Sequence, residues 1–415
     1  MKIIQLPPYY TPEQISSSHL TEDLEKAFVE AGYDMEIYAP TPTRGVSCET
    51  RSEYRKKKRE EKYNGKIVVR RFSMFREGRN PFLRALRYVL CNIVQYFKGI
   101  RVKNADILMA GSTPPTQGLL CGLVKKRLKI PFIYNLQDIF PDSLVSSGLT
   151  HNGSLLWKIG RRMEKFTYHS ADKIIVISEA FRQNLLDKGV PEEKIAVIPN
   201  WVDCDVVKPV SRAENSLFEE LQLDRSGFYV TYAGNLGEAQ GIDTILSAAA
   251  LLEDRPDIQF ILFGGGPNYA KYEQHLAEKG HANVRLFPLQ PPERISEVYS
   301  LGNVSLVACK KGLGAAAMPS KTWSIMAAGC PVLAVFDRDS ELDKLLTENA
   351  CGVCVEPDAP EALRDAVVQI YNDQESAGEM GTRGRRYVVE NLSTSISVQK
   401  YIEVIAEIAD SGDSS

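Results

Sequence analysis

Three glycine-containing segments in the second half of the chain have residue types that suit a phosphate group. They are residues 234–241, 264–267 and 310–320, and each follows an apolar run typical of a buried strand and precedes a helical pattern. Glycines let backbone N–H groups approach an anion, and helix starts add partial positive charge. One such segment is most often a tight turn, but loops of this kind meet at one edge of a parallel sheet. The three together therefore predict a phosphate-bearing ligand.

Lys321 is the charged side chain best placed to meet that phosphate. It begins the helical pattern after the third segment, where a lysine opposes the helix dipole unless an anion compensates for it. The alternative is a solvated lysine in the first turn of a helix. The sequence contains neither a GxxxxGK[ST] loop nor a GxGxxG turn after the first strand of either half. This argues against an ordinary NTPase and a dehydrogenase.

Strand-like and helical patterns alternate along the chain and must position these segments. Such alternation predicts an α/β fold with parallel sheets covered by helices on both faces. We expect one doubly wound, Rossmann-like domain at residues 1–208 and a second at 209–393. Residues 394–415 are expected to form a helix that crosses back to the first domain, followed by a disordered tail. Residues 44–66 are polar and basic and are expected to form a long exposed loop.

Basic residues are concentrated in the first half. Between Arg51 and Lys103 there are 17 lysines and arginines against 4 glutamates, although the net charge of the whole chain is −3. Within this stretch, residues 81–100 form an amphipathic helical pattern that is expected to contact an anionic membrane. The alternative is a helix that packs on the sheet and keeps its charges in solvent. The stretch lacks the pattern of a nucleic-acid-binding module, so no nucleic-acid partner is expected.

The chain is expected to act in the cytoplasm, peripherally at the inner face of the cell membrane. No apolar run approaches the ~18 residues that a membrane span needs. The first residues do not resemble a signal peptide, because the apolar run after Met1 is short and ends at Pro7.

Seven segments follow one another in a specific order. They include YNLQDIFPDSL at 134–144, VIPNWVD at 197–203, YAGNLGEAQGIDTIL at 232–246, FGGGP at 263–267 and MPSKTWSIMAAGCPVLAV at 318–335, together with 9–40 and 163–178. The ordered set resembles family 4 of the retaining glycosyltransferases over roughly residues 1–405, and in particular bacterial enzymes that build O-antigen, capsule or other surface glycans. The resemblance implies the GT-B fold, in which two Rossmann-like domains face an interdomain cleft.

The resemblance also implies a UDP-sugar donor on the second domain and a lipid-linked glycan acceptor on the first. Transfer would keep the anomeric configuration and need no obligate cofactor or metal. The departing diphosphate gains negative charge, so fixed positive charge should lower the barrier. Asn235 and Gln240 occupy positions where many family members carry Arg and Lys, and Lys321 is the expected replacement. The residues expected to bind the donor are Asn200, Gly234, Asn235, Gln240, Gly264, Gly265, Gly266, Pro319, Ser320 and Ser324.

A second departure concerns the pair of glutamates that the family usually carries. Their positions hold Ala316 and Ser324 here, so contacts to the sugar hydroxyls are expected from backbone groups of residues 312–318. A donor with fewer free hydroxyls, such as an N-acetylated or deoxy hexose, would suit this site.

In the first domain, Asp138 is the catalytic candidate, because it follows an apolar strand pattern. It could accept a hydrogen bond from the incoming hydroxyl or position the donor sugar, and the alternative is an Asp that caps the following turn. Gln137 stands where the family often has a histidine or arginine. Glu13 is the candidate base on the acceptor side, with Ser16 and Ser17 in the same loop, and the alternative is a solvated loop glutamate.

Two other functions stay open from the sequence. A GT-B nucleotide-sugar epimerase should carry a cluster of carboxylates and histidines in its cleft, and none is evident. A nucleotide-sugar-binding protein without turnover would fit the neutral residues at 235 and 240. The prediction is a retaining hexosyltransferase of bacterial surface polysaccharide synthesis, without a metal site.

Overall fold

The chain forms two compact units in a computed structural model. The first comprises Met1–Pro199 and Val398–Ser415, and the second comprises Asn200–Ser397. This division falls a few residues before the expected boundary at residue 208. The described residues are 1–13, 18–78, 80–146, 148–314 and 318–412.

The first unit is built on an eight-stranded sheet with strand order β3-β4-β2-β1-β5-β6-β7-β8. Its strands are β1 (Lys2–Gln5), β2 (Asp34–Pro40), β3 (Arg59–Lys62), β4 (Ile67–Phe72), β5 (Ile107–Gly111), β6 (Phe132–Leu136), β7 (Lys173–Val176) and β8 (Ile195–Val197). All neighbouring strands are parallel except β3 and β4. The order reverses beside β1, so the loops after β1 and β5 flank the place where doubly wound sheets usually bind ligands.

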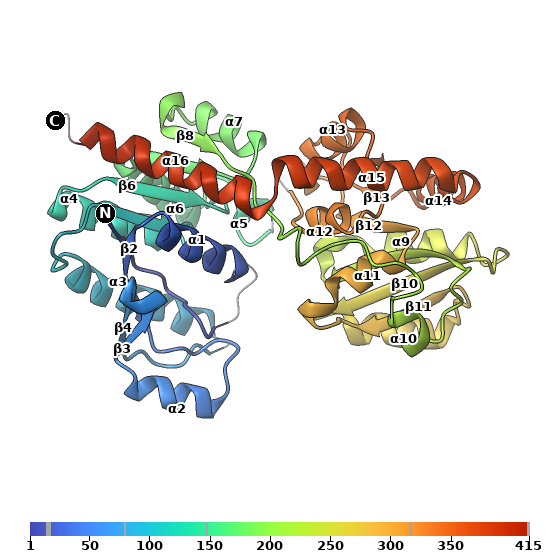
Figure 1. Ribbon diagram of the computed structural model, residues 1–415, viewed down its shortest axis with the longest axis horizontal. Helices are drawn as coiled ribbons and strands as arrows, with labels where there is room; N and C mark the ends of the chain where they lie inside the picture. Colours follow the sequence, from blue (N-terminus) through green and yellow to red (C-terminus); the bar gives the residue numbers. More distant parts are fainter. Residues whose placement is uncertain (14–17, 79, 147, 315–317, 413–415) are drawn as a thin grey trace. The chain divides into compact units, whose positions relative to one another are not determined.

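Helices cover both faces of this sheet (Figure 1). They are α1 (Ser18–Glu30), α2 (Cys48–Lys56), α3 (Pro81–Gly99), α4 (Thr116–Leu128), α5 (Asp142–Ser146), α6 (Leu155–Ser170) and α7 (Glu179–Asp187). The last helix, α16 (Thr394–Gly412), belongs to the first unit from Val398 onward, and Lys173 Nζ pairs with Glu407 Oε1 at 2.7 Å. α4 packs between α3 and α6.

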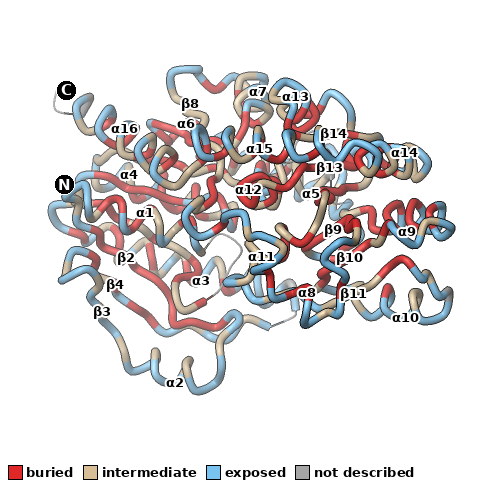
Figure 2. Tube along the Cα trace, turned by 45° about the vertical axis from the view of Figure 1, so that its right-hand side comes forward, coloured by how far each residue is buried: buried red, intermediate tan, exposed pale blue. Residues whose placement is uncertain are grey.

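The prediction that residues 44–66 form a loop is wrong. Ser47 caps α2 by accepting a hydrogen bond from the Thr50 N–H, and β3 pairs antiparallel with the edge strand β4. The helix has no buried residue, so its sequence carries no apolar period that could have revealed it. Figure 2 shows α2 in the colours of exposed and intermediate residues.

The second unit is built on a six-stranded, parallel sheet with strand order β11-β10-β9-β12-β13-β14. Its strands are β9 (Phe228–Asn235), β10 (Ile258–Gly265), β11 (Val284–Pro288), β12 (Val304–Ala308), β13 (Val332–Val335) and β14 (Gly352–Val355). Its helices are α8 (Leu217–Glu220), α9 (Ile242–Ala250), α10 (Tyr269–Lys279), α11 (Ile295–Leu301), α12 (Lys321–Ala327), α13 (Glu341–Glu348), α14 (Pro360–Asn372) and α15 (Gln374–Asn391).

Two hydrophobic clusters form the core of the second unit. Residues of β9 alternate between them: Tyr229 packs in one cluster, and Phe228 and Val230 pack in the other. Because neighbouring side chains of a strand point to opposite faces, the sheet is buried on both sides, as in other parallel sheets. The strand order reverses beside β9, so the loops after β9 and β12 flank the usual ligand position of this sheet.

Candidate functional site

The three glycine-containing segments meet at one edge of the second sheet. They follow β9, β10 and β12, which are neighbours in the strand order. Leu236 N–H donates to the Gly265 carbonyl at 2.6 Å, and Lys310 N–H donates to the Ala239 carbonyl at 2.9 Å. Hydrogen bonds therefore join the first loop to each of the other two.

Close packing in these loops requires glycine. Gly266 has φ +100°, and a Cβ there would overlap the Asn235 side chain. A Cβ at Gly264 would overlap the Leu236 side chain. The glycines thus let the loop after β10 lie directly against the loop after β9.

Lys321 directs its ammonium group into the loop after β9. Nζ donates to Tyr232 Oη at 3.2 Å and lies 4.3 Å from the centroid of the Tyr232 ring. Gly234 has φ +153°, which disfavours other residues, and a Cβ there would lie 2.5 Å from Nζ, so a side chain at this position would also displace the ammonium. Tyr232 Oη in turn donates to the Asn235 carbonyl at 2.8 Å, which holds the ring in place.

The Lys321 ammonium has no carboxylate partner among the residues that the structure describes. Burial lowers the pKa of Lys321 to about 8, and no acidic side chain opposes that effect. Buried charges in proteins are usually paired. The residue as a whole keeps intermediate exposure, and an anion bound at the loop after β9 would compensate the charge of the ammonium.

The start of α12 offers fewer free backbone donors than the sequence suggested. Ser320 makes no side-chain cap, and the N–H groups of Thr322 and Trp323 donate to the carbonyls of Pro319 and Ser320. Ser324 is partly buried on the first turns of this short helix. The side chain of Lys321 is therefore a stronger feature of this segment than the helix end.

The loop before α12 is held by Asp337, which follows β13. Its carboxylate accepts the N–H of Gly312 at 2.9 Å and the N–H of Gly314 at 2.7 Å. These two N–H groups, which were expected to meet the sugar, already have an acceptor. Residue 316 lies outside the described residues.

In the first unit, Gln137 and Asp138 follow β6 and are tied to the loop after β5. Ser112 Oγ accepts the N–H of Gln137 at 3.0 Å and that of Asp138 at 3.2 Å. Asp138 is exposed, and its Oδ2 accepts from Ser143 Oγ at 3.2 Å. Partial burial raises the pKa of this carboxyl, while the hydrogen bonds of Ser143 and of the Ile139 backbone oppose the rise.

Glu13 is a buried carboxylate that joins the loops after β1 and β2. It is 2% exposed, and its Oε1 accepts the N–H of Thr43 at 2.7 Å and of Arg44 at 2.9 Å. Its Oε2 accepts the N–H of Tyr10 at 3.2 Å. Glu13 is thus neither a solvated glutamate nor one with free oxygens, and its environment favours a positioning role. Ser16 and Ser17, from the same loop, lie outside the described residues.

Comparisons with known sequences and structures agree on one family. The profile described as "Glycosyltransferase Family 4" matches residues 18–206, and the profile "Glycosyl transferases group 1" matches residues 214–387. The chain belongs to glycosyltransferase family 4. It is therefore a retaining glycosyltransferase.

Two curated relatives of this glycosyltransferase are bacterial proteins. The chain is 27% identical to "Probable glycosyltransferase WbjE" of Pseudomonas aeruginosa over 301 residues, which are 72% of this chain and 74% of that protein. It is 30% identical over 235 residues to "Putative colanic acid biosynthesis glycosyl transferase WcaI" of Escherichia coli K12. That match covers 56% of this chain and 58% of WcaI.

Solved structures show that this glycosyltransferase has the GT-B fold. Sucrose-phosphate synthase of Thermosynechococcus elongatus superposes with a TM-score of 0.75 at 16% identity, over 99% of both chains. HepE of Anabaena, in complex with UDP-glucose, superposes with a TM-score of 0.70 at 15% identity, over 98% of this chain and 100% of that one.

Asn235 and Gln240, the two positions where the sequence resemblance implied Arg and Lys, hydrogen-bond within the loop after β9. Gln240 Oε1 accepts the N–H of Gly237 at 3.1 Å and is 3.4 Å from Asn235 Nδ2. Asn235 and Gln240 therefore brace the loop around residue 237 and bring no positive charge to it. Asn200, the remaining donor-side candidate, begins the second unit and is partly buried.

Two residues at the site in the second unit, Tyr232 and Asp337, were not predicted from the sequence. Tyr232 lies inside β9 and resembles an ordinary core residue, so no local pattern could have marked its contact with Lys321. Asp337 did have a signal, because an acid directly after the buried strand β13 lies at the carboxyl edge of the sheet.

Proposed function

We propose that this glycosyltransferase moves a hexose from a UDP-sugar to a lipid-linked acceptor in bacterial surface polysaccharide synthesis. The proposal for the donor rests on the Lys321 ammonium, which is buried beside Gly234 and has no carboxylate partner within the described part of the chain. The UDP-glucose complex of HepE and the name of WcaI support the donor class and the pathway class. The neutral residues around the site suit an N-acetylated or deoxy hexose.

In this proposal the diphosphate of the donor lies against Lys321 and the loops that begin at Gly234 and Gly264. As the bond from the sugar to the diphosphate breaks, negative charge grows on the phosphate oxygens. Lys321 stabilises this charge from a fixed position, because Tyr232 already orients its ammonium. Asn235, Gln240, Gly265 and Gly266 shape the loops around the phosphates, while Asn200, Pro319, Ser320 and Ser324 contact the rest of the nucleotide sugar.

On the first unit, we assign the acceptor hydroxyl to Asp138. It is exposed, and its backbone is fixed to Ser112, so its carboxylate can meet a hydroxyl without rearrangement of the loop. Gln137 lies beside it, and its Nε2 donates to Asn135 Oδ1 at 2.9 Å. Glu13, Ser16 and Ser17 belong to the acceptor-side loop, where Glu13 holds the backbone in shape.

UDP should stabilise the protein against heat, and Lys321→Ala should remove most of that stabilisation. The physical reason is the loss of the buried Lys321 ammonium at the proposed phosphate position. The measurement is a thermal shift with UDP, GDP and dTDP, followed by the release of nucleotide from the corresponding sugar donors. Lys310→Ala is the matched control, because Lys310 lies in the same loop region but pairs with Glu238 at 3.1 Å. An unchanged UDP shift in Lys321→Ala would exclude Lys321 as the phosphate ligand.

We propose a peripheral membrane contact for the same enzyme through residues 51–103 and centred on α3. The apolar side chains of this helix are exposed: Phe82 83%, Leu83 51%, Leu86 49%, Val89 49%, Leu90 39%, Ile93 48% and Phe97 50%. The helix has no acidic residue and carries the exposed Arg84 near its start. An apolar face with basic neighbours suits the interface of an anionic bilayer. Across the described ranges, each helix is too short or too polar to span a bilayer.

The variant Leu86→Asp/Ile93→Asp should lower binding to phosphatidylglycerol vesicles at least about 10-fold, because it puts two charges on the apolar face. Co-sedimentation with vesicles measures this effect. Leu251→Asp is the control, since Leu251 is an equally exposed leucine (42%) in the second unit. Equal binding of wild type and the double variant would remove α3 from the membrane contact.

A further inference from the structure

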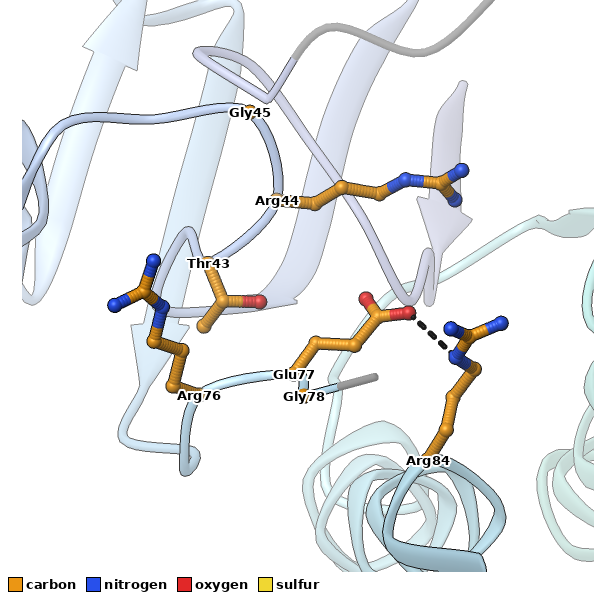
Figure 3. A pocket seen from close by; sticks show the side chains of 7 residues that line it. All are labelled: Thr43, Arg44, Gly45, Arg76, Glu77, Gly78 and Arg84. Atoms are coloured by element: carbon orange, nitrogen blue, oxygen red, sulfur yellow. Dashed lines mark ion pairs between the residues drawn. The ribbon is translucent and has the colours of Figure 1, made fainter. Parts of the chain in front are cut away.

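A pocket rich in arginine lies at the carboxyl edge of the first sheet. This pocket, which we call the arginine pocket, is open to solvent and has a volume of about 610 Å³. It is lined by Thr43, Arg44, Gly45, Arg76, Glu77, Gly78 and Arg84. Its walls come from the loop after β2, the loop after β4 and the first turns of α3. Figure 3 shows Arg44 and Arg76 extending to opposite sides of Thr43, while Arg84 rises from α3 toward Glu77.

The acidic side chain in the pocket is already engaged. Glu77 Oε1 pairs with Arg84 Nε at 3.0 Å, and Glu77 Oε2 accepts from Tyr9 Oη at 2.7 Å. Arg44 and Arg76 form no ion pair with any residue that the structure describes. Arg44 instead lies over the Tyr9 ring, with its guanidinium carbon 5.5 Å from the centroid. The pocket therefore has more positive charge than its own carboxylate can balance.

Two further arginines, Arg87 and Arg51, lie next to the residues that line the pocket. Arg87 is 0% exposed, its NH2 donates to Thr43 Oγ1 at 3.2 Å, and its buried NH1 has no hydrogen-bond partner among the described residues. Burial lowers the pKa of Arg51, and the neighbouring positive charges of Arg55, Arg76 and Arg87 lower it further. Gathering like charges in partly buried positions is unfavourable unless an anion neutralises them.

Two features next to the arginine pocket, the Glu13 loop and the apolar start of α3, indicate which kind of anion binds in it. Glu13 binds the N–H groups of Thr43 and Arg44, so the acceptor-side loop and the pocket wall are one connected structure. On the other side, Arg84 belongs to α3, directly after the exposed apolar residues Phe82 and Leu83. A group bound here would be polar and anionic, and its attached chain could continue over an apolar surface.

We propose that the arginine pocket binds the phosphate or diphosphate that joins the lipid to the glycan in the acceptor. Arginine suits this group, since its planar guanidinium donates two parallel hydrogen bonds to phosphate oxygens. The volume lies within the usual range of ligand pockets. The assignment to the acceptor rests on the proposed function, whereas phosphate binding by these arginines can be measured without it.

The test is isothermal titration calorimetry of the full-length protein with three probes: farnesyl diphosphate, inorganic pyrophosphate and farnesol. The titrations are made with saturating UDP and repeated without UDP in Lys321→Ala protein, so that the donor site contributes in neither case. Arg44→Ala/Arg76→Ala should raise the Kd for farnesyl diphosphate about 30-fold or more, because two charge-assisted contacts are lost. Both residues are exposed, so the fold should tolerate their removal.

The matched control is Lys126→Ala/Arg127→Ala, which removes two exposed positive charges from α4, away from the pocket lining, and should change the Kd less than about 3-fold. Equal affinity of the pocket variant and wild type would overturn the proposal, and so would an equal loss in the control. If farnesol or pyrophosphate bound as tightly as farnesyl diphosphate, the proposal that the ligand has both an anionic head and an apolar chain would be wrong. Displacement of farnesyl diphosphate by phosphatidylglycerol vesicles would instead assign the pocket to bulk lipid headgroups.

These results can be separated from a failure of the donor proposal. If UDP binds nowhere, the titrations of Lys321→Ala protein still report on the arginine pocket. If UDP binds normally and the pocket variant has no effect, the phosphate assignment fails alone.

Discussion

Replacing Lys321 with methionine should lower kcat for sugar transfer about 10²–10³-fold while making the unliganded protein more stable. The loss in rate is that expected when one fixed group that stabilises developing negative charge is removed. The gain in stability follows from the pKa of Lys321, which burial lowers from 10.5 to about 8. A shift of this size disfavours the charged lysine by about 3 kcal/mol relative to the unfolded chain. Attraction to the Tyr232 ring offsets part of it, so we expect a rise of about 2 kcal/mol in the free energy of unfolding at neutral pH.

The stability difference between wild type and Lys321→Met should depend on pH. Below the folded pKa of about 8, lysine is charged in both states and the full penalty of burying the charge is present. Between this value and the unfolded pKa of 10.5, the folded protein has lost the proton and the unfolded chain still binds it. The stability of wild type therefore rises toward that of the variant as pH increases through this window. Urea unfolding of both proteins at several pH values measures the difference.

UDP affinity of the wild type should fall as pH rises through about 8, because only the charged lysine attracts the diphosphate. The variant Lys321→Met should show weak binding with little pH dependence over the same range. Lys310→Met serves as the control, since its exposed ion pair with Glu238 should contribute little to stability or rate. A Lys321→Met enzyme that kept its kcat, or a stability gain that did not change with pH, would contradict this account of the site.

Replacing Glu13 with alanine should lower the free energy of unfolding by about 3–5 kcal/mol. The substitution removes the acceptor of three backbone N–H groups, those of Tyr10, Thr43 and Arg44, at a position that is 2% exposed. A buried donor left without an acceptor typically costs about 1–3 kcal/mol, and the charge of the carboxylate strengthens the lost bonds. Chemical denaturation measures the loss, and Glu22→Ala, an exposed glutamate on α1, should change stability by less than about 0.5 kcal/mol.

Glu13→Gln separates a positioning role from a catalytic one. Glutamine keeps one acceptor oxygen but loses the negative charge, so a positioning residue should lose stability and raise KM for the acceptor with a modest change in kcat. A general base should instead lose about 10²–10⁴-fold in kcat at unchanged stability. We expect the first result, because the oxygens of Glu13 already accept backbone donors.

Sequence by itself determined the architecture of this glycosyltransferase and the place of its loops. The runs at β9, β10 and β12 are apolar and short, and helical patterns follow the glycine-containing segments after them. These features depend on local backbone sterics and on the period of burial, which a single segment contains. The topology rule for parallel sheets then brings the three loops to one edge, and the structure joins them by hydrogen bonds.

Tertiary structure alone decided which charges lack partners and which apolar faces remain open. The pattern of α3 predicts one apolar face, but only packing shows that Phe82 and Ile93 stay exposed. Lys321 meets Tyr232, which is 89 positions away in the chain, and the arginine pocket joins Arg44 to Arg76 and Arg84. These contacts depend on how segments that are distant in the sequence pack against one another. The free energy of a charged side chain is in turn set by the groups around it and by its distance from water. No local period encodes those surroundings.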